Sequence, residues 1–288
     1  MTSDVGGTGR PPGSGPAFDP SSIQPPRGDP YLRAIGISKR FGSQDHAGAE
    51  ALVNVSCDVR RGDFVSIVGT SGCGKSTLLQ ILGGLMRPTS GEVLLAGTRI
   101  TGPPFEIIYL FQQYSKSLYA WKTVDGNVAL GMRYRGVPRR EVEARCARYL
   151  ELVGLREFER HYPWQLSGGM QQRVAIARAL ACEPHVLLMD EPFSSVDALT
   201  RASLQDLILR LWADQRLTIV FVTHDTDEAV YLSRRVLVMS DSPGRFKYEL
   251  DIDLPYPRDQ LTTRESAGYL RYRHEILSRL VGAIPAGS

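Results

Sequence analysis

Residues 69–77 constrain the fold of this chain more than any other part of the sequence. They read Gly-Thr-Ser-Gly-Cys-Gly-Lys-Ser-Thr and fit the pattern GxxxxGK[ST]. The apolar run 64–68 precedes them with the length of a buried strand, and residues 76–85 follow with helical spacing. A strand, a glycine-rich turn and a helix in this order can wrap backbone N–H groups around a phosphate at the positive end of the helix dipole. The alternative is a glycine-rich turn with a purely structural role.

The polar side chains of a phosphate-binding loop of this kind bind the phosphates and the metal ion. We expect Lys75 to contact the β- and γ-phosphates of a bound nucleotide and Ser76 to bind Mg²⁺. The residues expected to surround the phosphates are Gly69, Thr70, Ser71, Gly72, Cys73, Gly74, Lys75, Ser76 and Thr77.

Two more apolar runs, residues 186–189 and 218–222, have the length of buried strands and end in polar residues. Short β-rich runs alternate with helical patterns along the chain, which predicts a parallel sheet with crossover helices. Such sheets bind ligands at the carboxyl ends of their strands, where these polar residues lie. The expected fold class is therefore α/β.

Two adjacent acids, Asp190 and Glu191, directly follow the run 186–189. We assign Asp190 to Mg²⁺, because an acid in this position acts on the metal in P-loop proteins. Glu191 is then placed to activate the attacking water as a general base. A solvated acidic strand end is the alternative, and the phosphate-binding loop favours the functional interpretation.

His224 follows the next apolar run, residues 218–222, at the end of a neighbouring strand. This position makes it a candidate to sense the γ-phosphate and to orient the attacking water. A histidine with a structural role is the alternative.

Composition argues against several classes of protein. No stretch approaches the roughly 18 to 20 continuous apolar residues of a membrane helix, so the chain is not expected to form a membrane channel. A net charge of +3 without a long Lys/Arg run gives no support for a nucleic-acid partner. Residues 1–16 lack the apolar core of a secretory signal, and the four cysteines form no CxxC pair. We therefore expect a cytoplasmic protein with reduced thiols.

The rest of the chain divides by composition and spacing. Residues 1–30 combine Gly, Pro, Ser and Asp with few large apolar side chains, which predicts a disordered leader. Residues 138–181 have helical periodicity and form a predicted helical insertion. Residues 236–239 and 246–254 are expected to form two antiparallel strands joined by a type II turn at Pro243 and Gly244.

A final helix is predicted over residues 263–281. It would present four apolar or aromatic residues on one side: Tyr269, Tyr272, Ile276 and Leu280.

Residues 166–173, Leu-Ser-Gly-Gly-Met-Gln-Gln-Arg, open another helical pattern. Ser167 and the N–H groups of Gly168 and Gly169 lie at the start of this predicted helix and suit a second phosphate group. The segment resembles the signature of ATP-binding cassette (ABC) proteins. This resemblance implies that ATP is the nucleotide, and that the signature faces ATP held by a second subunit. Two ATP molecules would then lie between two copies of the chain.

The resemblance covers residues 31–281 and assigns three further residues. Phe41 matches the aromatic residue that stacks on adenine. Gln112 matches the loop glutamine that reaches Mg²⁺, with Gln113 as the alternative register. Asp197, in Ser195-Val196-Asp197, matches the loop that couples the two ATP sites.

In the terms of this family, the expected fold is a P-loop NTPase (RecA-like) core with an antiparallel β subdomain and a helical signature subdomain. The ATPase domain would cover residues 31–262, with the helical subdomain at about 114–182. Residues 263–288 would form the C-terminal helix and tail.

Residues 118–124, Leu-Tyr-Ala-Trp-Lys-Thr-Val, and the segment 242–245 resemble ATPases of the nitrate, sulfonate, taurine and bicarbonate importers. This resemblance implies an ATP-hydrolysing motor at the cytoplasmic face of the membrane. Its partners would be integral-membrane permease subunits, contacted by residues 112–121, and an extracytoplasmic solute-binding protein. An exporter motor or an ABC module outside transport is the alternative.

Overall fold

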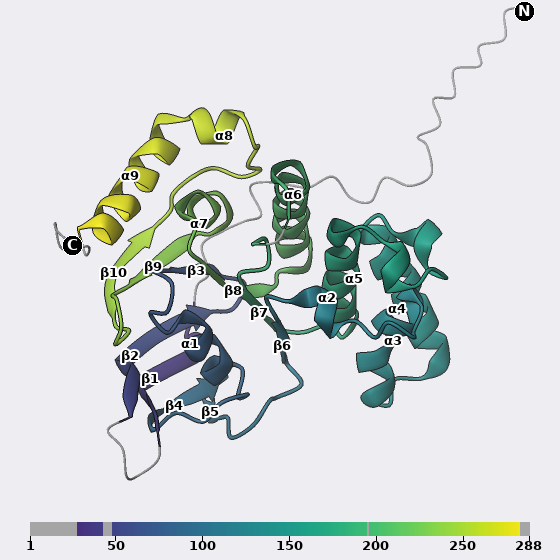
Figure 1. Ribbon diagram of the computed structural model, residues 1–288, viewed down its shortest axis with the longest axis horizontal. Helices are drawn as coiled ribbons and strands as arrows, with labels where there is room; N and C mark the ends of the chain where they lie inside the picture. The colour runs from purple at the N-terminus through teal and green to yellow at the C-terminus, as the bar shows by residue number, and fades with distance from the viewer. Residues whose placement is uncertain (1–27, 43–47, 195, 283–288) are drawn as a thin grey trace, which may run out of the picture.

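The computed structural model describes residues 28–42, 48–194 and 196–282, which fold into two sheets and a set of helices (Figure 1). The predicted leader, residues 1–30, lies almost entirely outside the described residues, and Pro30 already begins the first strand. Within the described residues, none of the helices combines the length and the apolar composition that crossing a bilayer requires.

The smaller sheet is antiparallel and has the strand order β2-β1-β4-β5. Its strands are β1 (Pro30–Phe41), β2 (Ala49–Arg60), β4 (Ser90–Leu95) and β5 (Thr98–Arg99). The larger sheet has the order β10-β9-β3-β8-β7-β6 and is parallel except for β10, which pairs antiparallel with β9. Its strands are β3 (Phe64–Val68), β6 (Ile107–Leu110), β7 (Val186–Asp190), β8 (Thr218–Thr223), β9 (Arg235–Met239) and β10 (Phe246–Asp251).

The central strands of the larger sheet are buried on both faces, which explains their continuous apolar sequences. Successive side chains point to opposite faces, so Val65 and Ile67 of β3 pack towards the antiparallel sheet while Phe64 and Val68 pack away from it. Helix α1 (Lys75–Leu82) fills the space between the two sheets with its apolar side chains.

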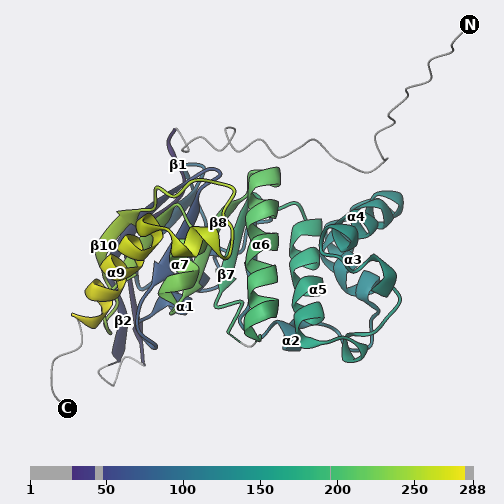
Figure 2. The same ribbon diagram turned by 90° about the horizontal axis from the view of Figure 1, so that it is seen from above.

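The opposite face of the larger sheet is covered by helices from the second half of the chain (Figures 1 and 2). They are α6 (Ala198–Gln215), α7 (Thr226–Leu232) and α9 (Ala267–Val281). The short helix α8 (Thr262–Glu265) has no buried residue and packs against α9. A helical part lies beside the sheet, on the far side of α6 from α9. It contains α2 (Tyr114–Ser117), α3 (Val124–Tyr134), α4 (Arg139–Leu152), α5 (Gly168–Ala181) and the short 3₁₀ helices η2 (Arg156–Phe158) and η3 (Pro163–Gln165).

The strands predicted at 64–68, 186–189 and 218–222 are confirmed as β3, β7 and β8. The predicted antiparallel pair is confirmed as β9 and β10. The type II turn between them is wrong, because the Ser242–Pro243 peptide is cis and the φ of Gly244 lies outside the left-handed region. Gly244 instead bonds to β2: its N–H donates to the Ala51 carbonyl at 2.9 Å, and its carbonyl accepts from the Val53 N–H at 3.1 Å.

The single helix predicted over 263–281 is also wrong, because the structure divides it at Ser266. This residue has extended backbone angles, and its hydroxyl accepts from the Tyr269 N–H at 3.2 Å, which starts α9 as a separate helix. Tyr269, Tyr272 and Ile276 are buried on one side of α9 as the spacing predicted, and Leu280 packs partly buried against the same core.

Candidate functional site

The glycine-rich loop joins the carboxyl end of β3 to the start of α1. Gly72 and Gly74 have φ values of 79° and 99°, a backbone region that side chains rarely enter. A Cβ atom on Gly74 would lie 2.8 Å from the Ala51 carbonyl oxygen, so this position also lacks room for a side chain. Lys75 is buried, and its ammonium donates to the carbonyls of Gly69 at 2.9 Å and Thr70 at 2.8 Å.

The loop between β9 and β10 packs against the glycine-rich loop. The Thr70 hydroxyl donates to the Asp241 carboxylate at 2.6 Å. A Cβ atom on Gly244 would lie 2.2 Å from the Cys73 carbonyl oxygen, so glycine is required here for close approach. Sequence reasoning missed Asp241, because no local pattern signals a contact between residues so far apart in the chain.

Asp190 ends β7 beside the start of α1. One carboxylate oxygen accepts from the Ser76 hydroxyl at 2.9 Å, and the other accepts from the Tyr109 hydroxyl at 2.8 Å. Burial raises the pKa of Asp190, while these two hydrogen bonds favour its charged form and oppose the rise. A hydroxyl and a carboxylate in contact are hard oxygen ligands of the type that Mg²⁺ prefers, so Ser76 and Asp190 fit this ion. Sequence reasoning did not single out Tyr109.

Glu191 occupies a strained position at the same edge of the sheet. Its φ is 43°, in the left-handed region, and its N–H donates to the Val222 carbonyl of β8 at 2.9 Å. Backbone strain of this kind is typical of functional sites.

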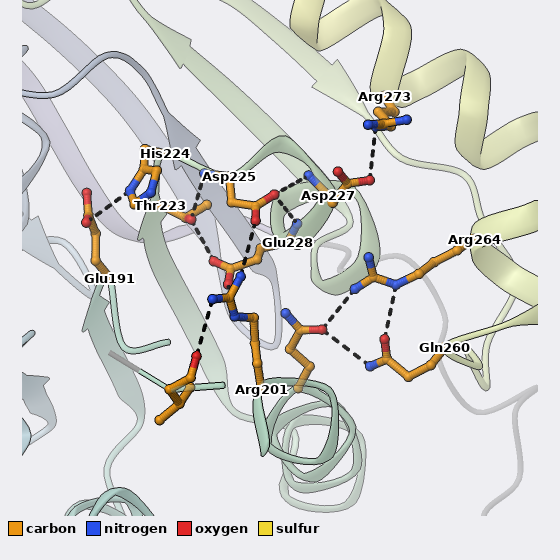
Figure 3. Close-up of polar contacts among 12 residues, drawn as sticks. Glu191, Arg201, Thr223, His224, Asp225, Asp227, Glu228, Gln260, Arg264 and Arg273 are labelled. Atoms are coloured by element: carbon orange, nitrogen blue, oxygen red, sulfur yellow. Dashed lines mark hydrogen bonds and ion pairs between the residues drawn. The ribbon is translucent and has the colours of Figure 1, made fainter. Parts of the chain in front are cut away.

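Three predicted site residues contact the Glu191 carboxylate. His224 Nδ1 lies 3.1 Å from one oxygen (Figure 3), and Gln112 Nε2 donates to the same oxygen at 3.3 Å. Lys75 Nζ lies 4.0 Å from the other oxygen. Gln112 is therefore the glutamine of this loop that contacts the acidic site, while the backbone carbonyl of Gln113 accepts from the Lys116 N–H at 3.2 Å.

Phe41 lies apart from this cluster, at the end of β1. Phe41 is 45% exposed, and the Lys39 ammonium lies 5.3 Å from the centroid of its ring. An exposed aromatic ring of this kind can stack on a planar base. Residues 43–47, which follow it, lie outside the described residues.

The residues of the predicted signature begin α5, as expected. The Ser167 hydroxyl caps this helix by accepting from the Met170 N–H at 3.3 Å. Gly169 packs against α6, because a Cβ atom on it would lie 2.5 Å from Thr200 Cγ2. Gly168 is the first residue of the helix.

Asp197 caps α6 by accepting from the Thr200 N–H at 3.0 Å. This backbone hydrogen bond is the main reason that the pKa of Asp197 is lowered. Ser195, which belongs to the same predicted loop, lies outside the described residues. The structure thus brings Lys75, Ser76, Gln112, Asp190, Glu191 and His224 together, and places Phe41, the signature and Asp197 on other elements.

One edge of the larger sheet thus brings together several polar groups. They are the glycine-rich loop, a buried lysine, a hydroxyl–carboxylate pair, and a second acid beside a histidine. This combination of fold and site defines a P-loop nucleotide-binding protein of the α/β class.

Comparisons with known proteins identify the family. The family model described as "ABC transporter" matches residues 52–194. An uncharacterized ABC transporter ATP-binding protein of Methanocaldococcus jannaschii is 48% identical over 249 residues, covering 86% of this chain and 91% of the relative. The aliphatic sulfonates import ATP-binding protein SsuB of Bacillus cereus is 41% identical over 244 residues, covering 85% and 93%.

Solved structures agree with the fold. A dimeric ATP-binding cassette in a post-hydrolysis state, bound to ADP and Pi, has a TM-score of 0.67 and 33% identity, covering 77% of this chain and 98% of that one. The structure of cbiO1 from Clostridium perfringens, part of the ABC transporter complex cbiONQ, has a TM-score of 0.71 and 25% identity, covering 88% and 95%.

The chain belongs to the family of ABC transporter ATP-binding proteins. Its fold is that of an ABC ATPase cassette, as the signature predicted.

Proposed function

We propose that two copies of this chain bind and hydrolyse two ATP molecules between them, and that this cycle energises transport through membrane subunits. One observation carries the catalytic part. The Glu191 carboxylate, on a strained backbone, meets His224, Gln112 and Lys75 beside the phosphate-binding loop. A carboxylate beside a cation and two polar side chains suits the activation of a water molecule next to a γ-phosphate.

In this proposal the phosphates lie in the loop from Gly69 to Thr77. Lys75 moves from the loop carbonyls to the β- and γ-phosphates, where its charge offsets charge that develops on the transferred group. Ser76, Asp190 and Gln112 would hold Mg²⁺, which would neutralise phosphate charge when bound.

Hydrolysis then needs a proton acceptor and an orienting group. Glu191 accepts a proton from the attacking water, the oxygen of which forms a bond to the γ-phosphorus as the bond to the bridging oxygen of ADP breaks. His224, 3.1 Å from Glu191, orients that water and contacts the γ-phosphate.

The remaining residues bind the nucleotide from both subunits. Phe41 stacks on the adenine of its own ATP, and Ser167, Gly168 and Gly169 bind the γ-phosphate of the ATP in the second copy. Asp197 links the two sites. The solved dimeric cassette bound to ADP and Pi supports this arrangement by similarity.

For the transported solute we propose a small anion, such as a nitrate, sulfonate, taurine or bicarbonate, taken up by import. The similarity to a sulfonate-import ATP-binding protein supports this class. Trp121 is 73% exposed and packs edge-on against Tyr119, and such exposed aromatic residues suit contact with permease subunits. An extracytoplasmic solute-binding protein completes the proposed complex at the cytoplasmic face of the membrane.

The catalytic proposal is tested by Glu191→Gln in the full chain. The amide keeps the size and the hydrogen bond to His224 but cannot accept the proton, so ATP turnover should fall at least about 100-fold. ATP binding should persist, and the variant should accumulate as an ATP-bound dimer. Turnover at the wild-type rate would show that Glu191 is not the base.

The transport proposal is tested by purifying the full chain with its membrane subunits and reconstituting the complex. Import predicts that ATPase activity rises when a binding protein carrying a small anion is added outside the vesicles. Activity that responds to a solute on the ATPase side would instead identify an exporter. Absence of any membrane subunit would favour an ABC module outside transport.

A further inference from the structure

The first turn of α6 contacts two parts of the proposed site at once. On one side, Thr200 packs against Gly169 at the start of the signature helix α5. On the other side, Arg201 reaches across to α7, the helix that is capped by Asp225, the residue after His224. The loop that precedes this turn contains Val196 and Asp197.

Arg201 makes three polar contacts that join this loop to α7 (Figure 3). Its Nη2 donates to the Val196 carbonyl at 3.4 Å. Its Nη1 lies 3.7 Å from the Asp225 carboxylate, and its Nε lies 3.8 Å from the Glu228 carboxylate. One guanidinium group therefore links the loop before α6 with Asp225, which caps α7, and with Glu228 in the first turn of α7.

The two acids that face Arg201 fix the backbone on both sides of His224. Asp225 caps α7 by accepting from the N–H groups of Asp227 at 2.8 Å and Glu228 at 3.3 Å. Buried Glu228 accepts from the Thr223 hydroxyl at 2.7 Å, and the same hydroxyl oxygen accepts from the Asp225 N–H at 3.0 Å. His224 lies between Thr223 and Asp225, so movement of these acids moves the histidine.

We propose that Arg201 is a positioning residue that couples the Val196–Asp197 loop to His224, and thereby couples the two ATP sites of the dimer. The inference rests on the proposed function, in which Asp197 faces the second copy and His224 faces the γ-phosphate. Contact of the loop with the second copy then pulls on α7 through Arg201 and shifts His224, which already lies 3.1 Å from Glu191, towards the γ-phosphate.

The geometry suits a contact that tightens. Charged hydrogen bonds between nitrogen and oxygen are about 2.7 to 2.9 Å long, so both ion pairs of Arg201 can shorten by about 1 Å when α6 and α7 approach. Only arginine has a planar fork of donors that can serve a carbonyl and two carboxylates together. Lysine would keep the charge but not this geometry.

The test uses the full chain with Glu191→Gln, which should form an ATP-bound dimer under the proposed function. Arg201→Met should leave the affinity of the monomer for ATP within about twofold and weaken the ATP-dependent dimer about tenfold, measured by sedimentation. In the same measurement at pH 8, where Glu228 is ionised, Glu228→Gln should weaken the dimer by a similar factor. The double variant should weaken it no more than either single change, because both act through one contact. In the chain with native Glu191, Arg201→Met should lower kcat while KM for ATP stays nearly constant.

Arg273→Met is the matched control. Arg273 pairs with Asp227 at 3.1 Å on the side of α7 that faces α9, so its loss loosens the same helix without touching the Val196–Asp197 loop. This control should change the dissociation constant of the ATP-bound dimer by no more than about twofold. Equal weakening by Arg273→Met, or additive effects of the Arg201 and Glu228 changes, would overturn the positioning role.

Two further outcomes separate this inference from the proposed function. If the Glu191→Gln parent forms no ATP-dependent dimer, the proposed function is wrong and the role of Arg201 is wrong with it. If the parent dimerises and Arg201→Met dimerises as tightly, only the role of Arg201 is wrong. Should Arg201→Met fail to fold, Arg201→Lys decides: it should weaken the dimer at least threefold, and no change would overturn the inference.

Discussion

Glu228 is a buried acid beside the proposed site, and its burial makes the stability of the protein depend on pH. Burial raises its pKa to about 7, while the Thr223 hydroxyl, Arg201 and His224 favour its charged form and Asp225 opposes it. The folded protein therefore holds a proton on Glu228 at pH values where the unfolded chain, with a carboxyl of ordinary pKa 4.5, has lost it. The contribution of Glu228 to stability is thus present below pH 4.5 and is lost as the pH rises to about 7.

We predict that Glu228→Gln removes this pH dependence. The amide can still accept from the Thr223 hydroxyl and never ionises. The free energy of unfolding of the variant should therefore equal that of the parent near pH 4.5 and exceed it increasingly as the pH rises. The relative gain should reach roughly 3 kcal/mol above pH 7, since each pKa unit is worth about 1.4 kcal/mol. Urea unfolding from pH 4.5 to 8 measures it, and parallel stability curves for the two proteins would contradict the prediction.

At the scale of elements, α7 is held at both ends by other parts of the chain. Asp225 caps its start, and the side chain of buried Arg258 satisfies its end. Arg258 Nη1 donates to the carbonyls of Val230 at 3.0 Å, Tyr231 at 2.8 Å and Ser233 at 2.9 Å. Its guanidinium also lies 4.1 Å from the centroid of the Tyr256 ring.

We predict that Arg258→Met lowers the free energy of unfolding by about 2 to 3 kcal/mol. Methionine fills most of the space but leaves the carbonyls at the end of α7 without their donor, and a buried unsatisfied carbonyl costs about 1 to 3 kcal/mol. Arg271→Met is the control, because Arg271 is exposed on α9 and should change stability by no more than about 0.5 kcal/mol. Chemical denaturation of both variants provides the measurement, and equal effects would exclude the capping role.

The elements that the sequence predicted best are those with a strong local pattern. β3, β7 and β8 are buried on both faces; β3 leads into the glycine-rich loop, and β7 and β8 end in polar residues, so length and boundaries could be read directly. The edge strand β5 has two exposed residues and no such pattern. The break at Ser266 depends on a side-chain cap that competes with a helical sequence on both sides, and helical periodicity cannot detect it.

The site divides in a similar way. The sequence predicted Lys75, Ser76, Asp190, Glu191 and His224 from motifs and strand ends, and Gln112 from the family resemblance. The structure brings these six together. Tyr109 and Asp241 were missed because their partners, Asp190 and Thr70, lie far away in the sequence. Arg201 was missed for the same reason, since its ion pairs depend on how α6 packs beside α7.

At the scale of the whole molecule, one segment of chain joins the acidic site to the exposed aromatic residues Tyr119 and Trp121. Gln112 contacts Glu191, and Tyr119 and Trp121 follow within the loop that leads to α3. Asn127 on α3 holds this loop in place: its side chain accepts from the Tyr119 N–H at 2.8 Å and donates to the Tyr119 and Lys122 carbonyls. Displacement of the loop by a membrane subunit would therefore reach the acidic site through Gln112.

We predict that Trp121→Ala separates ATP hydrolysis from its stimulation by membrane subunits. Trp121 is 73% exposed, so its loss should not disturb the fold. The basal ATPase rate of the isolated chain should stay within about twofold of the parent rate. In the reconstituted complex, stimulation by the loaded binding protein should fall about tenfold, as for an aromatic residue at the centre of an interface. Tyr134→Ala is the control, because Tyr134 is 85% exposed at the end of α3, away from the loop. Unchanged stimulation in Trp121→Ala would place the docking surface elsewhere, whereas equal losses in both variants would indicate a general effect on the helical part.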